Sequence, residues 1–344
     1  MKTLLRYLSP FAPDLAGATS ALFELDGLIV ICDAGGCTGN ICGFDEPRWF
    51  TRKSALFSAG LRDMDAILGR DRELAKKLVN AAKVADRKFM AVIGSPVPAV
   101  IATDFAALKH MCSRELTAPV LAVEASGTEY YEVGASKAYC ELFKSFAVEK
   151  LPVKANTVGV LGATPLDYSS LKAADKIAGK FAAAAVRVYG MNGTLDDVVR
   201  ASEVEKNIVV SPAGLKCAKY LERTFGTPYE CYAAAAADDL QLPDLNNKKV
   251  LVVHQNFAAQ EIKRVITQQN PAAEVDCGSF FHALNKDVDH RFASEDDFRA
   301  LFENNTFDVV IADSAFRRIV QDIFNGEWID CPHFAVSGRL LEEL

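Results

Sequence analysis

The sequence predicts an α/β protein in which parallel sheets form three separate units. Short runs of apolar, often β-branched residues recur along the chain, and a turn and about 10–15 residues of helical periodicity follow most of them. The chain has 344 residues, of which 50% are hydrophobic and 24% charged. This length suits two or three domains, and this composition excludes intrinsic disorder for the bulk of the chain.

The first unit is expected over residues 1–151. Its predicted strands are continuous apolar runs, which is typical of a parallel sheet covered on both faces; they lie at 27–32, 89–94 and 119–123. Residues 65–85 are amphipathic, with apolar side chains on one stripe, and are predicted to form one helix or two.

The second unit is expected over residues 152–243 and the third over residues 244–344, after the polar linker 242–247. The strands predicted in these units are 157–162, 186–189, 207–211, 249–254, 307–312 and 333–336. The predicted helices are 168–181, 195–201, 214–225, 258–268 and 315–324. We therefore expect three Rossmann-like subdomains around a central cleft, because ligands of open parallel sheets bind outside the carboxyl ends of the strands.

Charge and hydropathy argue against two classes of partner. The chain carries 38 Lys and Arg against 45 Asp and Glu, a formal charge of −7, so we predict neither a nucleic-acid nor a membrane partner. No apolar stretch approaches the ~18 residues of a membrane span. Residues 1–10 have no apolar core of signal-peptide length, which predicts a cytoplasmic protein. The odd number of cysteines, nine, favours free thiols or metal ligands over disulfides.

The densest candidate site follows the first predicted strand. Cys32, Cys37 and Cys42 fall within eleven residues, interleaved with glycines. This pattern can bring thiolates and backbone N–H groups to one inorganic core, which points to iron–sulfur ligation. In the alternative interpretation, Cys32 is a small buried residue at a strand end and Cys42 packs a loop.

Two further residues are candidates for contacts in the cleft or at an interface. His254 ends a predicted strand, where it could face the cleft, and the alternative is a structural histidine with satisfied hydrogen bonds. Arg48 follows the cysteine segment among charged residues, and the alternative is a solvated, ion-paired surface. No nucleophile elbow, kinase motif or H-E-x-x-H zinc motif is present, so hydrolase functions lack their usual support.

Several stretches, in order, resemble the nitrogenase component 1 family, which also holds the dark-operative protochlorophyllide and chlorophyllide reductases and the nickel-tetrapyrrole reductase. The Gly35-Gly36-Cys37-Thr38 turn resembles the family's Gly-Cys loop, whose cysteine binds an iron–sulfur cluster. The other similar stretches are 65–74, 94–104, 156–162, 193–198 and 225–229.

The resemblance implies a particular cofactor site. Cys37 matches the family's cluster cysteine, whereas Ser95 stands where the family commonly has another cysteine before a proline. Cys37 with Cys42 or Cys32 from each of two subunits would supply four thiolates to one 4Fe–4S cluster shared across a dimer interface. The residues expected to hydrogen-bond or tune this cluster are Asp33, Thr38 and Asn40, with Ser95 close by.

The resemblance also implies partners and an activity. The second subunit would be another copy or a paralogous chain, and an ATP-dependent iron protein or similar reductase would donate electrons. The chain would then be an oxidoreductase that reduces an unidentified small substrate. The alternative is a non-catalytic scaffold or carrier for a metal cofactor, a tetrapyrrole or a cluster precursor.

Overall fold

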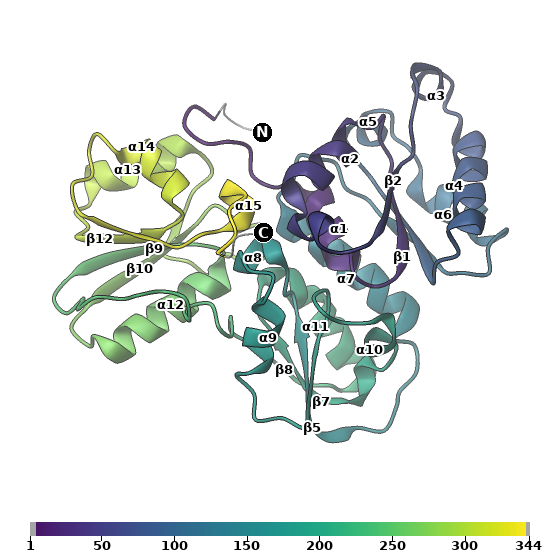
Figure 1. Cartoon of the computed structure of the whole chain (residues 1–344). Helices are drawn as coiled ribbons and strands as arrows, with labels where there is room; N and C mark the ends of the chain where they lie inside the picture. The colour runs from purple at the N-terminus through teal and green to yellow at the C-terminus, as the bar shows by residue number, and fades with distance from the viewer. Residues whose placement is uncertain (1–4, 342–344) are drawn as a thin grey trace.

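The computed structural model describes residues 5–341, so the first four residues of the expected amino-terminal segment 1–10 lie outside it, as do residues 342–344. The described part contains three sheets, and every paired strand in them is parallel. Their strand orders are β2-β1-β3-β4, β6-β5-β7-β8 and β11-β10-β9-β12-β13. The predicted α/β fold is confirmed. Figure 1 shows the three sheets with their helices grouped around the centre of the molecule.

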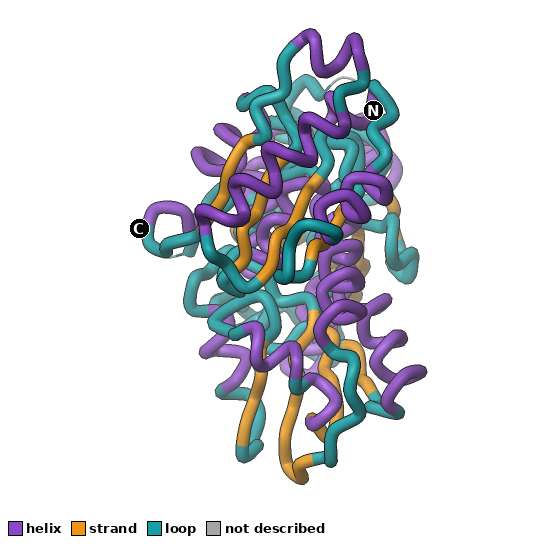
Figure 2. Tube along the Cα trace, turned by 90° about the vertical axis from the view of Figure 1, so that its right-hand side faces the viewer, coloured by secondary structure: helices purple, strands orange, loops and turns teal. Residues whose placement is uncertain are grey.

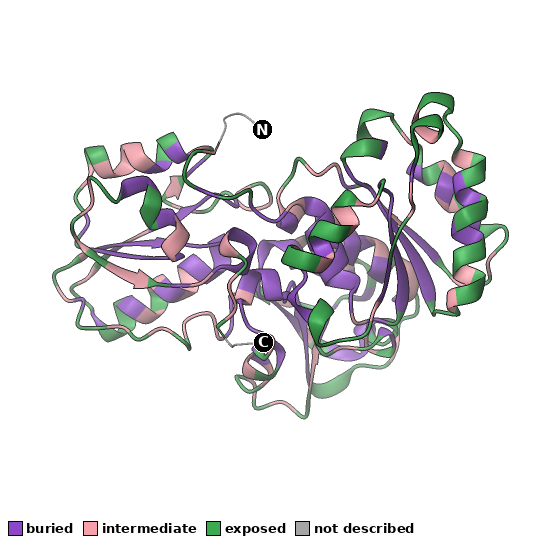
Figure 3. Cartoon of the chain, turned by 45° about the horizontal axis from the view of Figure 1, so that its top comes forward, coloured by how far each residue is buried: buried purple, intermediate pink, exposed green. Residues whose placement is uncertain are grey.

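The first sheet positions the cysteine segment. Its strands are β1 (Gly27–Ile31), β2 (Ala55–Ser58), β3 (Phe89–Ile93) and β4 (Val120–Val123). Alternate residues of β1 point to opposite faces: Leu28 and Val30 pack in one core cluster, and Ile29 and Ile31 in another. Strands β1 and β3 are buried along their whole length, which explains their continuous apolar runs, and Figure 3 shows buried strands in purple.

Helices cover both faces of this sheet. The face of Leu28 packs against α4 (Asp71–Ala85) and α6 (Phe105–Ser113), and the other packs against α1 (Asp14–Leu22) and α7 (Tyr131–Phe146). The expected helical stretch 65–85 is two helices, because Gly69 adopts a left-handed conformation (φ 60°) and ends α3 (Asp63–Leu68).

The second sheet has the same construction. Its strands are β5 (Lys154–Leu161), β6 (Ala185–Val188), β7 (Val204–Val209) and β8 (Tyr229–Cys231). Its helices are α8 (Pro165–Tyr168), α9 (Ala173–Ala178), α10 (Leu195–Val199) and α11 (Pro212–Phe225). Ser169 (φ 52°) ends α8, so the single helix predicted over 168–181 is wrong. Figure 2 shows the strands of the first and second sheets one above the other, each group flanked by helices.

The third sheet contains one correction. Its strands are β9 (Lys249–Val253), β10 (Glu274–Ser279), β11 (His290–Arg291), β12 (Val309–Ala312) and β13 (Glu327–Asp330). Its helices are α12 (Asn256–Gln269), α13 (Glu295–Asn304), α14 (Arg317–Val320) and α15 (Phe334–Ser337). The strand predicted at 333–336 is wrong. Its apolar residues belong to helix α15 and are buried because α15 packs against α8.

One hydrophobic core joins the three sheets. Helix α7 packs against both α1 and α11, and residues of all three sheets belong to this core. The amino-terminal residues also reach the third sheet, because the Glu295 carboxylate accepts hydrogen bonds from the backbone N–H groups of Arg6, Tyr7 and Leu8. None of the helices within residues 5–341 is both long and apolar enough to cross a membrane.

Candidate functional site

The cysteine segment forms a helical turn at the carboxyl end of β1. Gly35 has a φ of 121°, which favours glycine, and α2 (Gly36–Asn40) and a π-helical segment (Ile41–Asp45) follow it. Cys37 and Cys42 are both half-buried and pack against the same hydrophobic core. The structure therefore places these two thiols on one continuous helical segment at the edge of the first sheet.

Cys32 lies apart from the other two cysteines. It continues the alternation of β1 and is fully buried in the core cluster that contains Leu28 and Val30, on the opposite face of the sheet. Burial, and then the charge of Asp33, raise the pKa of the Cys32 thiol to about 12, so it is protonated at neutral pH. These observations favour the packing interpretation for Cys32, and its role as a ligand stays a prediction.

The buried Asp33 carboxylate anchors the turn. One oxygen, Oδ2, accepts a hydrogen bond from the backbone N–H of Thr38 at 2.8 Å. The other, Oδ1, accepts from the Thr38 hydroxyl at 3.0 Å and from the Ser58 hydroxyl at 2.6 Å. These bonds tie the first turn of α2 to the end of β2. Asp33 and Thr38 thus bond to each other, and their direct contact with a cluster stays a prediction.

Ser95 lies beside Cys37. Its hydroxyl is buried at the start of α5 (Pro96–Val100) and donates a hydrogen bond of 2.8 Å to the carbonyl oxygen of Cys32. Burial and Asp33 raise the pKa of the Cys37 thiol, and a hydrogen bond with Ser95 partly offsets this rise. A hydrogen bond from Ser95 to the Cys37 thiolate would replace the bond to Cys32, because the hydroxyl has a single proton.

Asn40 lies on the exposed side of the turn. Its amide Nδ2 donates to Oδ2 of Asp45 at 2.9 Å. Burial raises the pKa of the Asp45 carboxyl to about 6; the Asn40 hydrogen bond lowers it, and the Glu46 charge raises it further. Asn40 thus closes the π-helical segment that carries Cys42.

Exposed apolar side chains follow the carboxyl ends of β1 and β3, and another, Phe57, lies near the end of β2, which pairs with β1. Phe44 is 74% exposed, Phe50 65% and Val100 85%. We call this surface the apolar edge; it consists of Phe44, Phe50, Phe57, Val97, Val100 and Ile101. Several exposed apolar side chains near one end of a sheet commonly mark an interaction site.

The cysteine turn has three glycines that the packing of this chain does not explain. A Cβ atom on Gly36, Gly39 or Gly43 would meet no atom within 4 Å, and none of the three has a positive φ. Glycine in a helix costs roughly 1 kcal/mol relative to alanine. The missing side chains leave the backbone of the cysteine turn open to close approach from outside.

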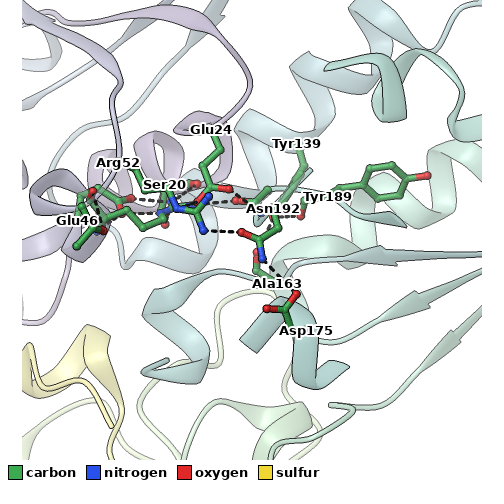
Figure 4. Close-up of polar contacts among 12 residues, drawn as sticks. Ser20, Glu24, Glu46, Arg52, Tyr139, Ala163, Asp175, Tyr189 and Asn192 are labelled. Atoms are coloured by element: carbon green, nitrogen blue, oxygen red, sulfur yellow. Dashed lines mark hydrogen bonds and ion pairs between the residues drawn. The ribbon is translucent and has the colours of Figure 1, made fainter. Parts of the chain in front are cut away.

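Arg48 ties the end of the cysteine segment to the rest of the molecule. Figure 4 labels three of its hydrogen-bond partners, Ser20, Glu24 and Glu46. Its guanidinium is fully buried and binds both carboxylate oxygens of Glu46, from Nε and from Nη2, each at 2.7 Å. It also donates to the carbonyl oxygens of Ser20 in α1 at 2.7 Å and of Gly190 at 2.8 Å. The expectation of a solvated surface pair is thus wrong for Arg48.

Neighbouring bonds extend this connection to the loop after β6. Glu24, which lies 3.3 Å from Nη1 of Arg48, accepts a 2.6 Å hydrogen bond from the backbone N–H of Asn192. Arg52 donates to Oδ1 of Asn192 at 2.7 Å. The cysteine segment is therefore held by α1 and by the second sheet together.

His254 lines a cavity of about 60 Å³ between the second and third sheets. Its Nδ1 accepts a hydrogen bond from the backbone N–H of Gln255, and its ring stacks on His333 with the centroids 4.1 Å apart. Burial lowers the pKa of the His254 imidazole to about 4, so it is neutral at physiological pH.

Three other residues near this cavity were not predicted as site residues. The hydroxyl of Tyr131 donates to Oδ1 of Asp167 at 2.8 Å and lies 3.2 Å from Nε2 of His333. The position of Asp167 just after a predicted strand is the signal that could have identified it. Tyr131 and His333 carry no comparable signal, because their proximity depends on how the units pack.

Within residues 5–341, no three His, Cys, Asp or Glu side chains are grouped closely enough to hold a metal ion. One chain thus offers two half-buried thiols, of Cys37 and Cys42, rather than a complete ligand set. Three parallel α/β units with a thiol-bearing turn at one sheet edge define the structural class of this protein.

Comparison with known proteins gives the family. The sequence matches the family described as nitrogenase component 1 type oxidoreductase over residues 13–234, and the chain belongs to this family. No curated protein matches it. The structure of nitrogenase Cp1 at pH 6.5 superposes with a TM-score of 0.71 at 10% identity, covering 96% of this chain and 87% of that one. Nitrogenase Cp1 at pH 5 gives a TM-score of 0.60 at 14% identity, with 97% and 78% covered. At these identities the structures share the fold, and the predicted family resemblance is confirmed.

Proposed function

We propose that this chain is a redox subunit that accepts electrons through an iron–sulfur cluster and passes them to a small substrate in the central cleft. The observation that supports this most directly is the pair of half-buried thiols, Cys37 and Cys42, on a glycine-rich turn within the apolar edge. Membership of the family implies an ATP-dependent iron protein as the electron donor. The nine free cysteines suit the reducing cytoplasm, which we propose as its location.

The donor set of the turn suits a shared cluster. A 4Fe–4S cluster takes about four thiolates, and each chain offers two, Cys37 and Cys42. Two copies facing each other across the apolar edge would complete the set. The open faces of Gly36, Gly39 and Gly43 leave room for inorganic sulfide or a partner backbone. When bound, such a cluster supplies one-electron transfer.

Hydrogen bonds within the chain fix the conformation of the cysteine turn. Asp33 fixes the first turn of α2 through Thr38 and Ser58, and the Ser95 hydroxyl, which donates to the carbonyl oxygen of Cys32, lies close enough to influence the pKa of the Cys37 thiol. A serine oxygen is a poor iron ligand beside a thiolate, so we assign Ser95 to hydrogen bonding rather than ligation. Such bonds around a ligand sulfur set its basicity and the potential of the cluster.

The apolar edge supplies the second subunit's docking surface in this proposal. Its exposed aromatic and β-branched side chains would be removed from water by a partner. A second copy would form an isologous pair, whereas a paralogous chain would form a heterodimer. We favour the second copy because it brings an identical pair of thiols without another gene product.

A scaffold or carrier is the second candidate function. It is favoured by the presence of only two half-buried thiols per chain and by Ser95 in place of a family cysteine. Fewer protein ligands would hold a cluster or cofactor more loosely, which suits transfer to another protein better than repeated electron transfer.

Anaerobic reconstitution with iron and sulfide tests the proposal. We expect about four iron atoms per pair of chains and a dimeric mass in solution. Cys37→Ser and Cys42→Ser should each abolish iron binding, whereas Cys112→Ser, a buried core control, should retain it. Cys32→Ala should also retain iron if Cys32 only packs the core. A colourless monomer would overturn the proposal, and a bound cluster that dithionite reduces but that never passes electrons to an acceptor would select the carrier.

A further inference from the structure

Three polar side chains from different parts of the chain meet where the units join. Tyr131 is the first residue of α7, Asp167 lies in α8, and His333 directly precedes α15. All three are at most 4% exposed. The Tyr131 hydroxyl lies between the other two, 2.8 Å from Oδ1 of Asp167 and 3.2 Å from Nε2 of His333. A carboxyl, a hydroxyl and an imidazole thus form one continuous hydrogen-bonded chain.

Asp167, at one end of this hydrogen-bonded series, lines the 60 Å³ cavity. Its other oxygen, Oδ2, accepts from the Thr164 hydroxyl at 2.8 Å. Burial raises the pKa of the Asp167 carboxyl to about 7, while the hydrogen bonds from Tyr131 and Thr164 act in the opposite direction. A carboxyl poised near neutral pH can both give and take a proton.

The hydroxyl of Tyr131 allows two arrangements of protons. When Asp167 is ionised, Tyr131 donates to it and accepts from Nε2–H of His333. When Asp167 is protonated, it donates to Tyr131, which donates to a bare Nε2 of His333. The proton of His333 then sits on Nδ1, a buried atom without a hydrogen-bond partner among the described residues. The protonation of Asp167 and the tautomer of His333 are therefore coupled through one hydroxyl.

We propose that Asp167, Tyr131 and His333 form an acid–base relay that delivers a proton to a small molecule in the adjoining cavity. The inference rests on the proposed function, because reduction of a substrate consumes protons as well as electrons. At about 60 Å³ the cavity has room for roughly five water molecules, so its ligand has few non-hydrogen atoms.

The charges of the cavity define the class of ligand. Three carboxyl groups line it, from Asp167, Asp239 and Asp330, against a single ammonium group from Lys176, which pairs with Asp239 at 2.7 Å. Asp330 is paired with Arg339 at 2.8 Å, so Asp167 is the lining carboxyl without an ion pair among the described residues, and its charge when ionised disfavours an anion. Protonated Asp167 is a hydrogen-bond donor, so we assign the cavity to a small neutral molecule with an acceptor atom, such as a carbonyl or imine.

Each proton step is balanced. In the arrangement with ionised Asp167, the Tyr131 proton moves to Asp167, the Nε2 proton of His333 moves to Tyr131, and a proton from water binds Nδ1 of His333. The new O–H bond of Asp167 then breaks, its oxygen keeps the electron pair, and the proton moves to the lone pair of the ligand. The titratable groups that face the relay from the packed elements are Glu132, Tyr139, Tyr168 and His254.

NMR titration of the full chain, prepared without iron, tests the relay. With ¹³C-labelled carboxyl and ¹⁵N-labelled imidazole groups, we expect the Asp167 carboxyl and the His333 ring nitrogens to change with one common midpoint near pH 7. In Tyr131→Phe, Asp167 should still titrate, but this step should disappear from the His333 signals. Tyr139→Phe is the matched control: its hydroxyl is buried on the same helix but bonds the carbonyl oxygens of Ala163 and Tyr189, so the common step should remain.

The outcomes separate this inference from the proposed function. A His333 signal that stays constant through the Asp167 midpoint, or a common step that survives in Tyr131→Phe, would overturn the relay whether or not the chain binds iron. Acetone serves as a neutral acceptor probe and should shift the signals of Ala258, which lines the cavity, and raise the Asp167 midpoint. Acetone that leaves both unchanged would overturn the assignment of the ligand to this cavity.

Discussion

Nη1 of Arg48 donates a hydrogen bond of 2.8 Å to the carbonyl oxygen of Gly190, which lies 142 positions further along the chain. The same guanidinium holds Glu46, which follows the cysteine turn directly. A single buried cation therefore connects the proposed cluster site to the second sheet. Its contacts make the position of the cysteine turn depend on the packing between the two units.

Replacing Arg48 should be costly. In Arg48→Met, the carboxylate of Glu46 would stay buried without its cation and Glu24 would keep only Arg52, and we expect the free energy of unfolding to fall by about 3–5 kcal/mol. Urea unfolding measures this loss. Arg87→Met is the control, because its pair with Asp26 is exposed and such pairs contribute only ~0–1 kcal/mol. Equal losses in the two variants would contradict the role given to Arg48.

The close packing of α1 on α7 gives a second prediction. A Cβ atom on Gly134 would lie only 1.7 Å from the carbonyl oxygen of Asp14, so the two helices would have to separate. We expect Gly134→Ala to destabilise the protein by several kcal/mol, roughly the scale of severe overpacking. In Gly179→Ala the nearest atom is 3.4 Å away, and thermal unfolding should change little. A Gly134→Ala variant with wild-type stability would show that the helices are further apart than described.

The parts of the fold predicted from sequence are those whose signal is local. Strands β1, β3, β9 and β12 are buried on both faces and therefore read as apolar runs. Strand β13 has the sequence EWID and only half-buried or exposed residues, so it gives no such run. Helix α1 is buried on every side and built largely of small residues, which hides its periodicity.

Only the part of the candidate site that lies within one short stretch of sequence, the cysteine segment, was predicted. The position of Cys37 and Cys42 after the first strand follows from their place in the sequence. The alternation of β1 places Cys32 on the face of Leu28 and Val30, so the sequence itself separates it from Cys37 and Cys42. No local pattern could reveal the burial of Arg48 or the meeting of Tyr131 with His333, because these depend on contacts between units.

Asp33 should control the reactivity of Cys37. Its carboxylate disfavours the thiolate and also fixes the turn through Thr38 and Ser58. In Asp33→Asn the negative charge is lost, so the pKa of Cys37 should fall, and alkylation by iodoacetamide near neutral pH should become severalfold faster. Peptide mapping identifies the modified cysteine. Ser58→Ala removes one hydrogen bond to Asp33 but keeps the Asp33 charge. If it increased the alkylation rate of Cys37 as much as Asp33→Asn does, the effect would come from loosening of the turn and not from the charge.

The buried carboxyl of Asp167 should make stability depend on pH. Its pKa is raised from 3.8 to about 7, so between these values the native state binds more protons there than the unfolded state does. This contribution to stability is complete at acidic pH and is lost as the pH rises toward 7, by at most about 1.4 kcal/mol per pH unit. The lowered pKa of His254 makes stability rise with pH between about pH 4 and pH 6.5, in the wild type and in a variant at Asp167 alike.

The variant Asp167→Asn isolates this contribution. Its free energy of unfolding relative to wild type should increase from about pH 4 to about pH 7 and stay constant above that range. Glu132→Gln should show the same sign, because burial raises the pKa of that carboxyl to about 7 as well. Urea unfolding at several pH values measures both. A difference that does not change with pH would mean that Asp167 keeps an ordinary pKa in the folded chain.

Substitution of a glycine in the cysteine turn should affect the stability of the isolated chain and its assembly with a partner in opposite directions. A methyl group at Gly39 would meet no atom within 4 Å of this chain, and alanine favours a helix over glycine. Gly39→Ala should therefore raise the stability of the isolated chain by about 0.5–1 kcal/mol. In a dimer the same methyl group would stand where the partner or the cluster approaches, so dimer content and bound iron after reconstitution should fall. Asn80→Ala on the exposed face of α4 is the control, since it also improves helix propensity but lies outside the apolar edge. If Gly39→Ala gained stability and still bound a full complement of iron, the open backbone of the turn would need another explanation.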